Sequence, residues 1–387
     1  MIHVVVLGMG MVASHYMIGL ERIKNEGLEP YGIPLAKFKL PYSIDEIEVV
    51  GVYDVDESKV SRTVYEVAVK LVGDQLPVPF TLKDLTVRRG VHLGSLTGLP
   101  FKAKGLEEQY SLREAIDVLL DEWKELKPDV FINVITTEYG RAFNDINALY
   151  KAIEEDNRSI LTASQVYAYA AALYSKKVKP VAFVNVIPTP LANDEAMIQL
   201  YRECNGIVLG DDGATGATPL TADLLEHLAE RDRKVKYVVQ FNIGGNTDFL
   251  ALSLPERNLM KEETKSSIVK DILGYDAPHF IKPTGYLEPI GDKKYVAMHI
   301  EYYTFNKMID EIFISARIND SPALAGLLVD LARLAKVALD NGFKGTVYEI
   351  NAFYMKKPGP PGSKSISKII AYSNLLNWLK QLNALEY

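Results

Sequence analysis

Short runs of strongly apolar, β-branched residues recur along the first half of this sequence, and each run ends in small or polar residues. Runs of this kind, without polar alternation, are typical of strands buried on both faces of a parallel sheet. They lie at residues 3–8, 47–54, 129–136, 181–188 and 206–212. Helical periodicity marks the segments between them, at 57–72 after the candidate N-cap Asp56, at 112–126 after Ser111, and at 164–174. This alternation predicts a Rossmann-like, doubly wound α/β fold, in which ligands bind at the carboxyl ends of the strands.

The pattern changes after about residue 230, where two strand-like runs cover 237–245 and 295–305. They predict a second layer that is mainly an antiparallel sheet. A long helix is expected to follow Ser321 as N-cap, with Pro322 at its first position and Gly342 as its end, and a last helix should cover 366–382. We therefore expect an α/β domain over 1–220, an α+β domain over 221–320, and a C-terminal segment over 321–387 that packs back on the first domain.

Composition indicates which binding partners and which cellular compartment to expect. The 387 residues carry a formal net charge of −7, so nucleic acid is an unfavourable partner. The single cysteine, Cys204, can form no internal disulfide, and the six histidines are scattered without metal-ligand spacing, so no metal site is predicted. A cytoplasmic protein fits best. The apolar start at 4–13 is too short to span a membrane, and we expect no membrane association.

A glycine pattern follows the first predicted strand. Gly8 and Gly10, with Met11, Val12 and Ala13, match the dinucleotide fingerprint G-x-G-x-x-G/A in its expected context between a strand and a helix. The first glycine permits the tight turn, the second admits the pyrophosphate, and the small third residue allows close helix packing. The alternative is a glycine turn in an α/β domain that binds nothing.

Asp54 ends the second predicted strand, where a carboxylate commonly accepts hydrogen bonds from the ribose hydroxyls of NAD and repels the extra phosphate of NADP. The predicted cofactor is therefore NAD. The distance from the glycines is longer than usual, so the segment 27–43 is expected to be a looped-out insertion. The alternative role for Asp54 is to cap the next helix.

A second glycine-rich segment, at 210–218, leads from the fifth predicted strand into a helix with Pro219 at its first position. Its backbone N–H groups could bind a substrate phosphate. The segment could equally be a tight turn capped by Thr218.

Lys261 and Lys265 lie four residues apart on a predicted helix, so their ammonium groups share a face and an anion between them would relieve their repulsion. A plain surface pair of Lys265 with Glu262 is the alternative. Lys294 and Lys356 follow tight or proline-rich turns. Lysines that converge lower one another's pKa and can polarise a carbonyl oxygen or transfer protons.

Short polar side chains surround a Gly-Gly bend at 244–245 within an apolar strand pair. They belong to Asn242, Asn246 and Asp248. Buried amides and carboxylates need partners, which a polyhydroxylated ligand would supply, although a plain turn is the competing interpretation.

Taken together, these motifs resemble the inositol-phosphate synthases, the myo-inositol-1-phosphate synthase family. The similarity runs from GMGMVAS near the start to NAFYMKKP near the end, through the ordered series GDDGATG, FNIGGNTDFLALS, KEETKSSIVKDIL, GDKKYVAMHIEYY and NDSPALAGLLVDL. The resemblance implies NAD-dependent conversion of D-glucose 6-phosphate into 1D-myo-inositol 3-phosphate. In that family C5 of the sugar is oxidised, C6 is deprotonated, C6 attacks the C1 aldehyde, and C5 is reduced again.

The resemblance also implies residue roles. Lys261, Lys265, Lys294 and Lys356 would be the catalytic lysines, Lys265 and Lys294 at the oxyanions, with Asp320 ordering them. The cofactor would contact Gly8, Gly10, Met11, Val12, Ala13, Asp54, Thr137, Asp212 and Asp248. The substrate would contact Thr215, Gly216, Ala217, Thr218, Asn242 and Asn246.

The sequence departs from the family at two positions. Many members have a lysine at the position of Ala214 in the phosphate loop, and Ala13 replaces the third fingerprint glycine. Members are commonly homotetramers joined through the second domain, and some depend on a monovalent or divalent cation. Two other functions stay open from the sequence: an NAD-dependent dehydrogenase acting on another sugar phosphate, and a non-catalytic NAD-binding sensor.

Overall fold

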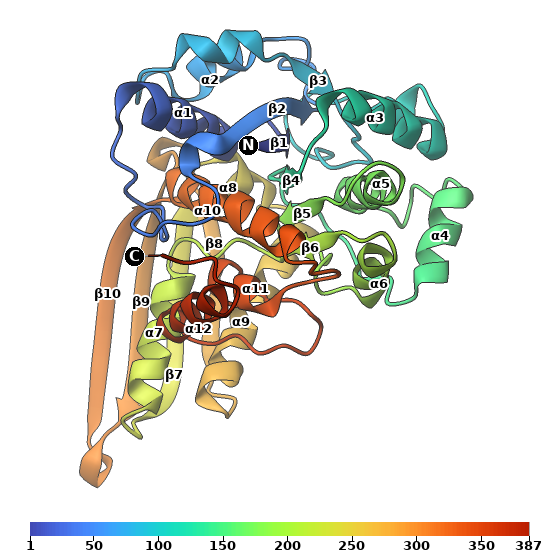
Figure 1. Cartoon of the computed structure of the whole chain (residues 1–387). Coiled ribbons are helices and arrows are strands. Elements are labelled where there is room, and N and C mark those ends of the chain that lie inside the picture. Colours follow the sequence, from blue (N-terminus) through green and yellow to red (C-terminus); the bar gives the residue numbers. More distant parts are fainter. Residues whose placement is uncertain (387) are drawn as a thin grey trace.

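The computed structural model describes residues 1–386, except for the side chains of 263–266. A six-stranded parallel sheet forms its first half in the order β3-β2-β1-β4-β5-β6 (Figure 1). The strands are β1 (Ile2–Leu7), β2 (Ile47–Asp54), β3 (Val87–Arg89), β4 (Val130–Asn133), β5 (Ala182–Asn185) and β6 (Ile207–Leu209). The predicted doubly wound α/β fold is confirmed. Strands β2 and β3 are added on one side of β1 and strands β4 to β6 on its other side, and such folds bind ligands at this switch between β1 and β4.

Helices cover both faces of this sheet, and each face has its own buried apolar cluster. One face packs against α1 (Met11–Glu26), α2 (Val64–Val72), α10 (Asp320–Asp340), α11 (Tyr348–Tyr354) and α12 (Lys368–Gln381). The other packs against α3 (Leu112–Leu126), α4 (Ile146–Glu154), α5 (Ala163–Lys177) and α6 (Glu195–Glu203). The C-terminal helices therefore return to the first sheet, and α10 packs against α1.

Local capping explains where several helices begin. Ser111 caps α3 as predicted, accepting a hydrogen bond from the N–H of Glu114. The prediction for 57–72 is wrong in its first half, because α2 begins only at Val64, where the hydroxyl of Thr63 accepts the N–H of Glu66. The long helix α10 begins at Asp320, earlier than the predicted N-cap at Ser321 allows.

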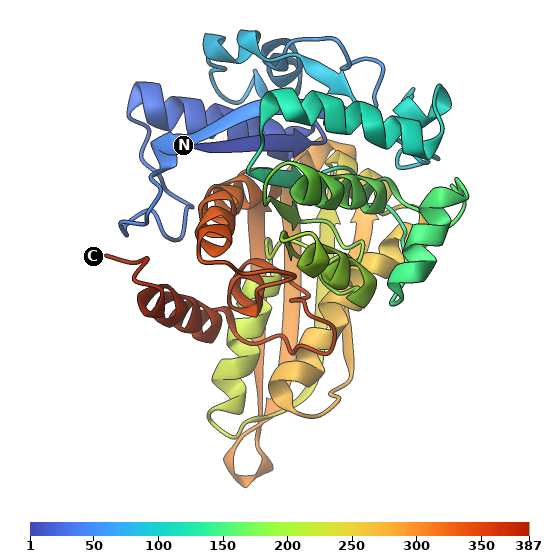
Figure 2. The same ribbon diagram turned by 45° about the vertical axis from the view of Figure 1, so that its right-hand side comes forward.

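A four-stranded sheet in the order β10-β9-β7-β8 forms the second layer. Its strands are β7 (Lys234–Gly244), β8 (His279–Tyr286), β9 (Lys293–Tyr303) and β10 (Ile309–Asn319). Two of its three strand pairs are antiparallel and the pair β7–β8 is parallel. The remaining helices are α7 (Thr218–Ala229), α8 (Thr247–Ala251) and α9 (Pro255–Leu273). Apolar residues of α7 and α9 pack against this sheet, and both helices lie in front of its long strands in Figure 2.

Alternate residues of the second sheet point to its other face, which carries large exposed side chains. Phe313 is 69% exposed and its ring stacks on His299 at 4.2 Å between centroids. Phe241 and Phe280 contact each other on the same sheet with centroids 5.7 Å apart. Within the described residues, no helix is long and apolar enough to cross a membrane.

Candidate functional site

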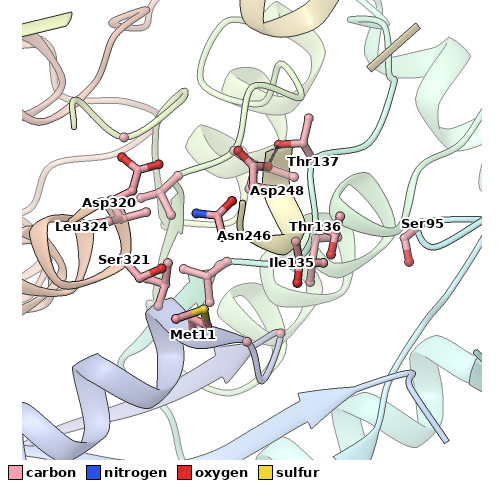
Figure 3. Close-up of a pocket in the computed structure, with 18 of the residues that line it drawn as sticks. Met11, Ser95, Ile135, Thr136, Thr137, Asn246, Asp248, Asp320, Ser321 and Leu324 are labelled. Atoms are coloured by element: carbon pink, nitrogen blue, oxygen red, sulfur yellow. Dashed lines mark hydrogen bonds between the residues drawn. The ribbon is translucent and has the colours of Figure 1, made fainter. Parts of the chain in front are cut away.

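A cleft of about 1510 Å³, including its open mouth, lies at the carboxyl ends of β1, β2, β4, β5 and β6. The second sheet and its helices form the opposite wall, and α10 closes one side. Figure 3 shows side chains from these different elements around one space: Met11 at the start of α1, Thr136 after β4, Asn246 and Asp248 after β7, and Asp320 on α10. The cleft therefore joins residues from across the whole sequence.

The glycine turn between β1 and α1 forms one end of this cleft. Gly8 has φ +100° and donates its N–H to the carbonyl of Tyr53 at 2.7 Å. A Cβ atom there would lie 2.8 Å from the backbone of Ile135, so only glycine fits. A Cβ on Gly10 would meet no atom within 4 Å, because this residue faces the open cleft.

Of the other fingerprint residues, Met11 and Val12 line the cleft and Ala13 is fully buried in the core beneath it. Helix α1 has no side-chain cap, so its first N–H groups are available to a ligand. Open space at a glycine beside an uncapped helix N-terminus fits the pyrophosphate of a dinucleotide.

Asp54 lies at the end of β2 and lines the cleft. Its carboxylate accepts the N–H of Met9 at 2.8 Å, which ties it to the glycine turn, and pairs with the ammonium of Lys59 at 3.2 Å. It also accepts the backbone N–H of Val55. Asp54 does not cap the next helix, since Thr63 does so, and the capping alternative is therefore wrong.

Two of the predicted lysines share one carboxylate that also lines the cleft. Lys261 on α9 and Lys356 after α11 each donate to Oδ1 of Asp212 at 3.0 Å. The side chain of Asp212 is 1% exposed. Lys261 also lies 3.7 Å from Asp248. Residues separated by more than a hundred positions in sequence thus meet at one buried carboxylate.

The two lysines differ in the direction of their pKa. Burial disfavours the charge of Lys261, but Asp212 and Asp248 outweigh it and raise its pKa above the usual value. Burial lowers the pKa of Lys356, and the neighbouring Lys261 and Lys294 lower it further against the pull of Asp212. Lys356 is therefore the better proton acceptor of the pair.

Lys294, at the start of β9, pairs with Asp320 of α10 at 2.8 Å, and Thr215 donates to the same oxygen at 3.2 Å. Lys294 is 6% exposed. Although burial acts to raise the pKa of Asp320, Lys294, Lys356 and Lys261 outweigh it and lower that pKa to about 2. The carboxylate is ionised at neutral pH and orders the cationic side of the cleft.

A polar network holds the segment after β7 against this cluster. The hydroxyl of Thr137 donates to Asp248 at 2.6 Å (dashed in Figure 3), and the amide of Asn246 donates to Asp292 at 2.9 Å. Asp292 in turn accepts the N–H and the hydroxyl of Ser321 at 2.8 and 2.7 Å. This network links the beginnings of α8, β9 and α10.

Some predicted residues lie elsewhere. Asn242 is buried within the second sheet, where it donates to the carbonyl of Lys282, and it is not among the residues that line the cleft. The described cleft lining includes Thr215 but not Gly216, Ala217 or Thr218; α7 begins at Thr218 with Ala217 as its N-cap. The side chain of Lys265 lies outside the described residues.

Sequence reasoning missed several residues of the site. Lys59, Asp292 and Ser321 all contact predicted site residues. Asp292 lies in the GDKK segment two residues before Lys294, and this short spacing could have identified it as a site residue. Ser321 was predicted only as an N-cap, and Lys59 has no distinguishing local pattern. Among the described side chains, no group of three or more His, Cys, Asp and Glu is placed to hold a metal ion.

Comparisons with known proteins agree with this geometry. A family model described as "Myo-inositol-1-phosphate synthase" matches residues 216–321, which span the second sheet and the start of α10. The inositol-3-phosphate synthase of Mycolicibacterium smegmatis is 27% identical over 374 residues, covering 92% of this chain and 93% of the relative. The solved inositol-3-phosphate synthase of Caenorhabditis elegans shares the fold, with a TM-score of 0.83 at 16% identity over 98% of this chain and 85% of that one.

A solved myo-inositol-1-phosphate synthase-related protein from Thermotoga maritima is more similar in sequence. It is 56% identical, with a TM-score of 0.93 and coverage of 98% of each chain. With this degree of identity over nearly the full length, the chain belongs to the myo-inositol-1-phosphate synthase family, a family of enzymes.

Proposed function

We propose that this protein converts D-glucose 6-phosphate into 1D-myo-inositol 3-phosphate with NAD as a recycled cofactor. The observation that carries the proposal is the meeting of Lys261, Lys294 and Lys356 with their carboxylates in the same cleft as the glycine turn. The reaction has no net oxidation, so one enclosed site must hold both the redox cofactor and the groups that move protons.

The chain's contribution to cofactor binding would be positional. The N–H groups at the start of α1 would bind the pyrophosphate, and the open face of Gly10 would let it approach. Asp54 would accept the ribose hydroxyls and disfavour NADP. When bound there, NAD supplies a reversible hydride acceptor for C5 of the sugar.

The lysines would carry out the proton transfers and stabilise charge. Lys356, whose pKa burial lowers, would accept the proton of the C5 hydroxyl and return it to the C5 oxygen when C5 is reduced again. The substrate phosphate would accept the C6 proton and pass it to the C1 oxygen after the aldol step. Lys294 would hold the developing negative charge on the sugar oxygens, since a fixed ammonium in a site shielded from water stabilises such charge strongly. Asp320 would keep Lys294 in place between turnovers.

The substrate phosphate would lie near Thr215, in the loop before α7. This hydroxyl lines the cleft and touches Asp320, so it marks the boundary between the cationic cluster and the loop. The N–H groups of this loop and of the α7 N-terminus would complete the phosphate site without the lysine that Ala214 replaces.

The test is an incubation of the purified protein with glucose 6-phosphate and a catalytic amount of NAD⁺, followed by phosphorus NMR and NADH absorbance. The proposal expects an inositol phosphate signal without accumulation of NADH. Lys294→Ala should abolish the product, whereas Lys293→Ala, which changes the exposed neighbour on β9, should leave turnover unchanged.

Other outcomes would assign another function. NADH that accumulates in step with product would indicate a dehydrogenase. NAD binding without turnover of any sugar phosphate would indicate a sensor. Normal turnover in Lys294→Ala would contradict the role of that lysine.

We also propose a homotetramer assembled through the open face of the second sheet. The exposed aromatic residues there, Phe241, Phe280 and Phe313, form an apolar surface of the kind that a second copy would cover. Light scattering of Phe313→Asp should show smaller particles than the wild type, and an unchanged mass would contradict this assembly.

A further inference from the structure

A fourth buried lysine, outside the cleft, lies directly beneath the segment that carries Lys356. Lys368 is the first residue of α12 and is 4% exposed. Its ammonium donates to the carbonyl oxygens of Ala352 at 2.6 Å and Met355 at 2.7 Å. These carbonyls belong to the last turn of α11 and the residue that follows it.

The position of Lys356 explains why this contact is needed. If α11 continued, the N–H of Lys356 would bond to the carbonyl of Ala352, four residues earlier. Instead this N–H donates to the carbonyl of Asp212 at 2.6 Å, which turns the chain toward the cleft. The carbonyl of Ala352 thereby loses its helical partner, and the ammonium of Lys368 takes that place.

Lys368 is itself anchored. The carboxylate of Asp223 accepts the backbone N–H of Lys368 at 2.6 Å and that of Ile369 at 3.2 Å, and Ser367 caps α12. Burial lowers the pKa of Lys368 to about 7. The carboxylate of Asp223 acts to raise this pKa, and the nearby Lys356 adds a smaller lowering effect. A neutral amine keeps two of its three N–H donors, enough for both carbonyls.

We propose that Lys368 is a positioning residue for Lys356: by bonding the carbonyls of Ala352 and Met355 it fixes where the chain leaves α11, and so holds the Lys356 amine against Asp212. This role rests on the proposed function insofar as Lys356 acts in catalysis. The placement itself is a property of the protein without ligands.

The first measurement is steady-state kinetics of the full chain with glucose 6-phosphate and NAD⁺. Lys368→Met keeps the stem of the side chain and removes the donors, and kcat should fall about 100-fold, the usual effect of displacing a catalytic group by about 1 Å. KM and NAD affinity should change little. Lys368→Arg, which restores donors, should recover most of kcat, and the control Lys364→Met, at an exposed lysine of the preceding loop, should match the wild type.

The second measurement needs no turnover. Lysine NMR of the protein without ligands follows the titration of Lys356, with its signal assigned by Lys356→Arg. In Lys368→Met the pKa of Lys356 should rise toward its ordinary value, because the amine leaves its buried position. Lys364→Met should leave that titration unchanged.

The two measurements separate this proposal from the proposed function. A wild type that forms no inositol phosphate would refute the function alone, and the titration of Lys356 would still test Lys368. An unchanged kcat in Lys368→Met, or an unchanged pKa of Lys356, would overturn the positioning role. A loss of activity in Lys368→Met that Lys368→Arg does not recover, with an unchanged pKa of Lys356, would also overturn it, because this result indicates a lysine that only supports the fold.

Discussion

Replacing Asp320 with Asn tests the electrostatic organisation of the cleft. The pair with Lys294, and the nearby Lys356 and Lys261, hold the pKa of Asp320 at about 2. Each pKa unit corresponds to about 1.36 kcal/mol, so lowering the pKa from 3.8 to about 2 gives about 2.5 kcal/mol of stability to the ionised state. At neutral pH the variant should therefore be less stable by about this amount, because the neutral amide, like the protonated acid, lacks the charge that pairs with Lys294.

The sign of the pH dependence follows from the same pKa. Because the pKa of Asp320 is lower in the folded chain than in the unfolded chain, its stabilisation is complete above about pH 5 and is lost as the pH falls toward about 2. The free energies of unfolding of wild type and variant should therefore converge in acid.

Urea unfolding of both proteins without ligands at about pH 7, 5 and 3 measures this difference directly. The matched control is Asp310→Asn, which changes an exposed carboxylate on β10 and should follow the wild type at each pH. A stability difference between wild type and Asp320→Asn that stays constant across the acid range would refute the reasoning.

Four further variants test other parts of the site. Gly8→Ala should lower the melting temperature, because its Cβ would lie 2.8 Å from the backbone of Ile135, whereas Gly10→Ala should keep the melting temperature and lose NAD binding by calorimetry. Equal melting temperatures would contradict this contrast. Asp54→Ser should weaken NAD binding roughly 10-fold or more and bring the Kd values for NAD and NADP closer together. An unchanged ratio of these two Kd values would contradict the role of Asp54. The folded Lys368, with its pKa of about 7, releases a proton above pH 7 that the unfolded chain keeps. Measured by urea, the free energy of unfolding of the wild type should therefore rise by about 2 kcal/mol relative to that of Lys368→Met between about pH 7 and 9. A constant difference would contradict that pKa.

The sequence predicted the first sheet well because its strands are buried on both faces and read as continuous apolar runs. The missed strands lack that signal. β3 has only three residues, β8 contains Pro283 and Gly285, and β10 has only exposed and half-buried residues. The start of α2 was misplaced because Asp56 and Thr63 are both good N-cap residues, and only Thr63 has a glutamate three residues later to complete the cap.

The candidate site was predictable where a local pattern or the family resemblance marked a residue. The glycine turn has such a pattern, and the resemblance selected Lys261, Lys294 and Lys356. Local sequence gave no indication that Asp212 accepts hydrogen bonds from two lysines, or that the side chain of Asn242 is buried within the second sheet. These contacts depend on how distant elements pack, which no short spacing encodes.

The carboxylate of Asp212 joins three segments that are far apart in sequence: the loop after β6, helix α9, and the turn after α11. Both α11 and α12 also contribute apolar residues to the core on one face of the first sheet. The cleft and the core therefore share the same C-terminal helices, and removal of these helices should disturb the first sheet and the lysine cluster together.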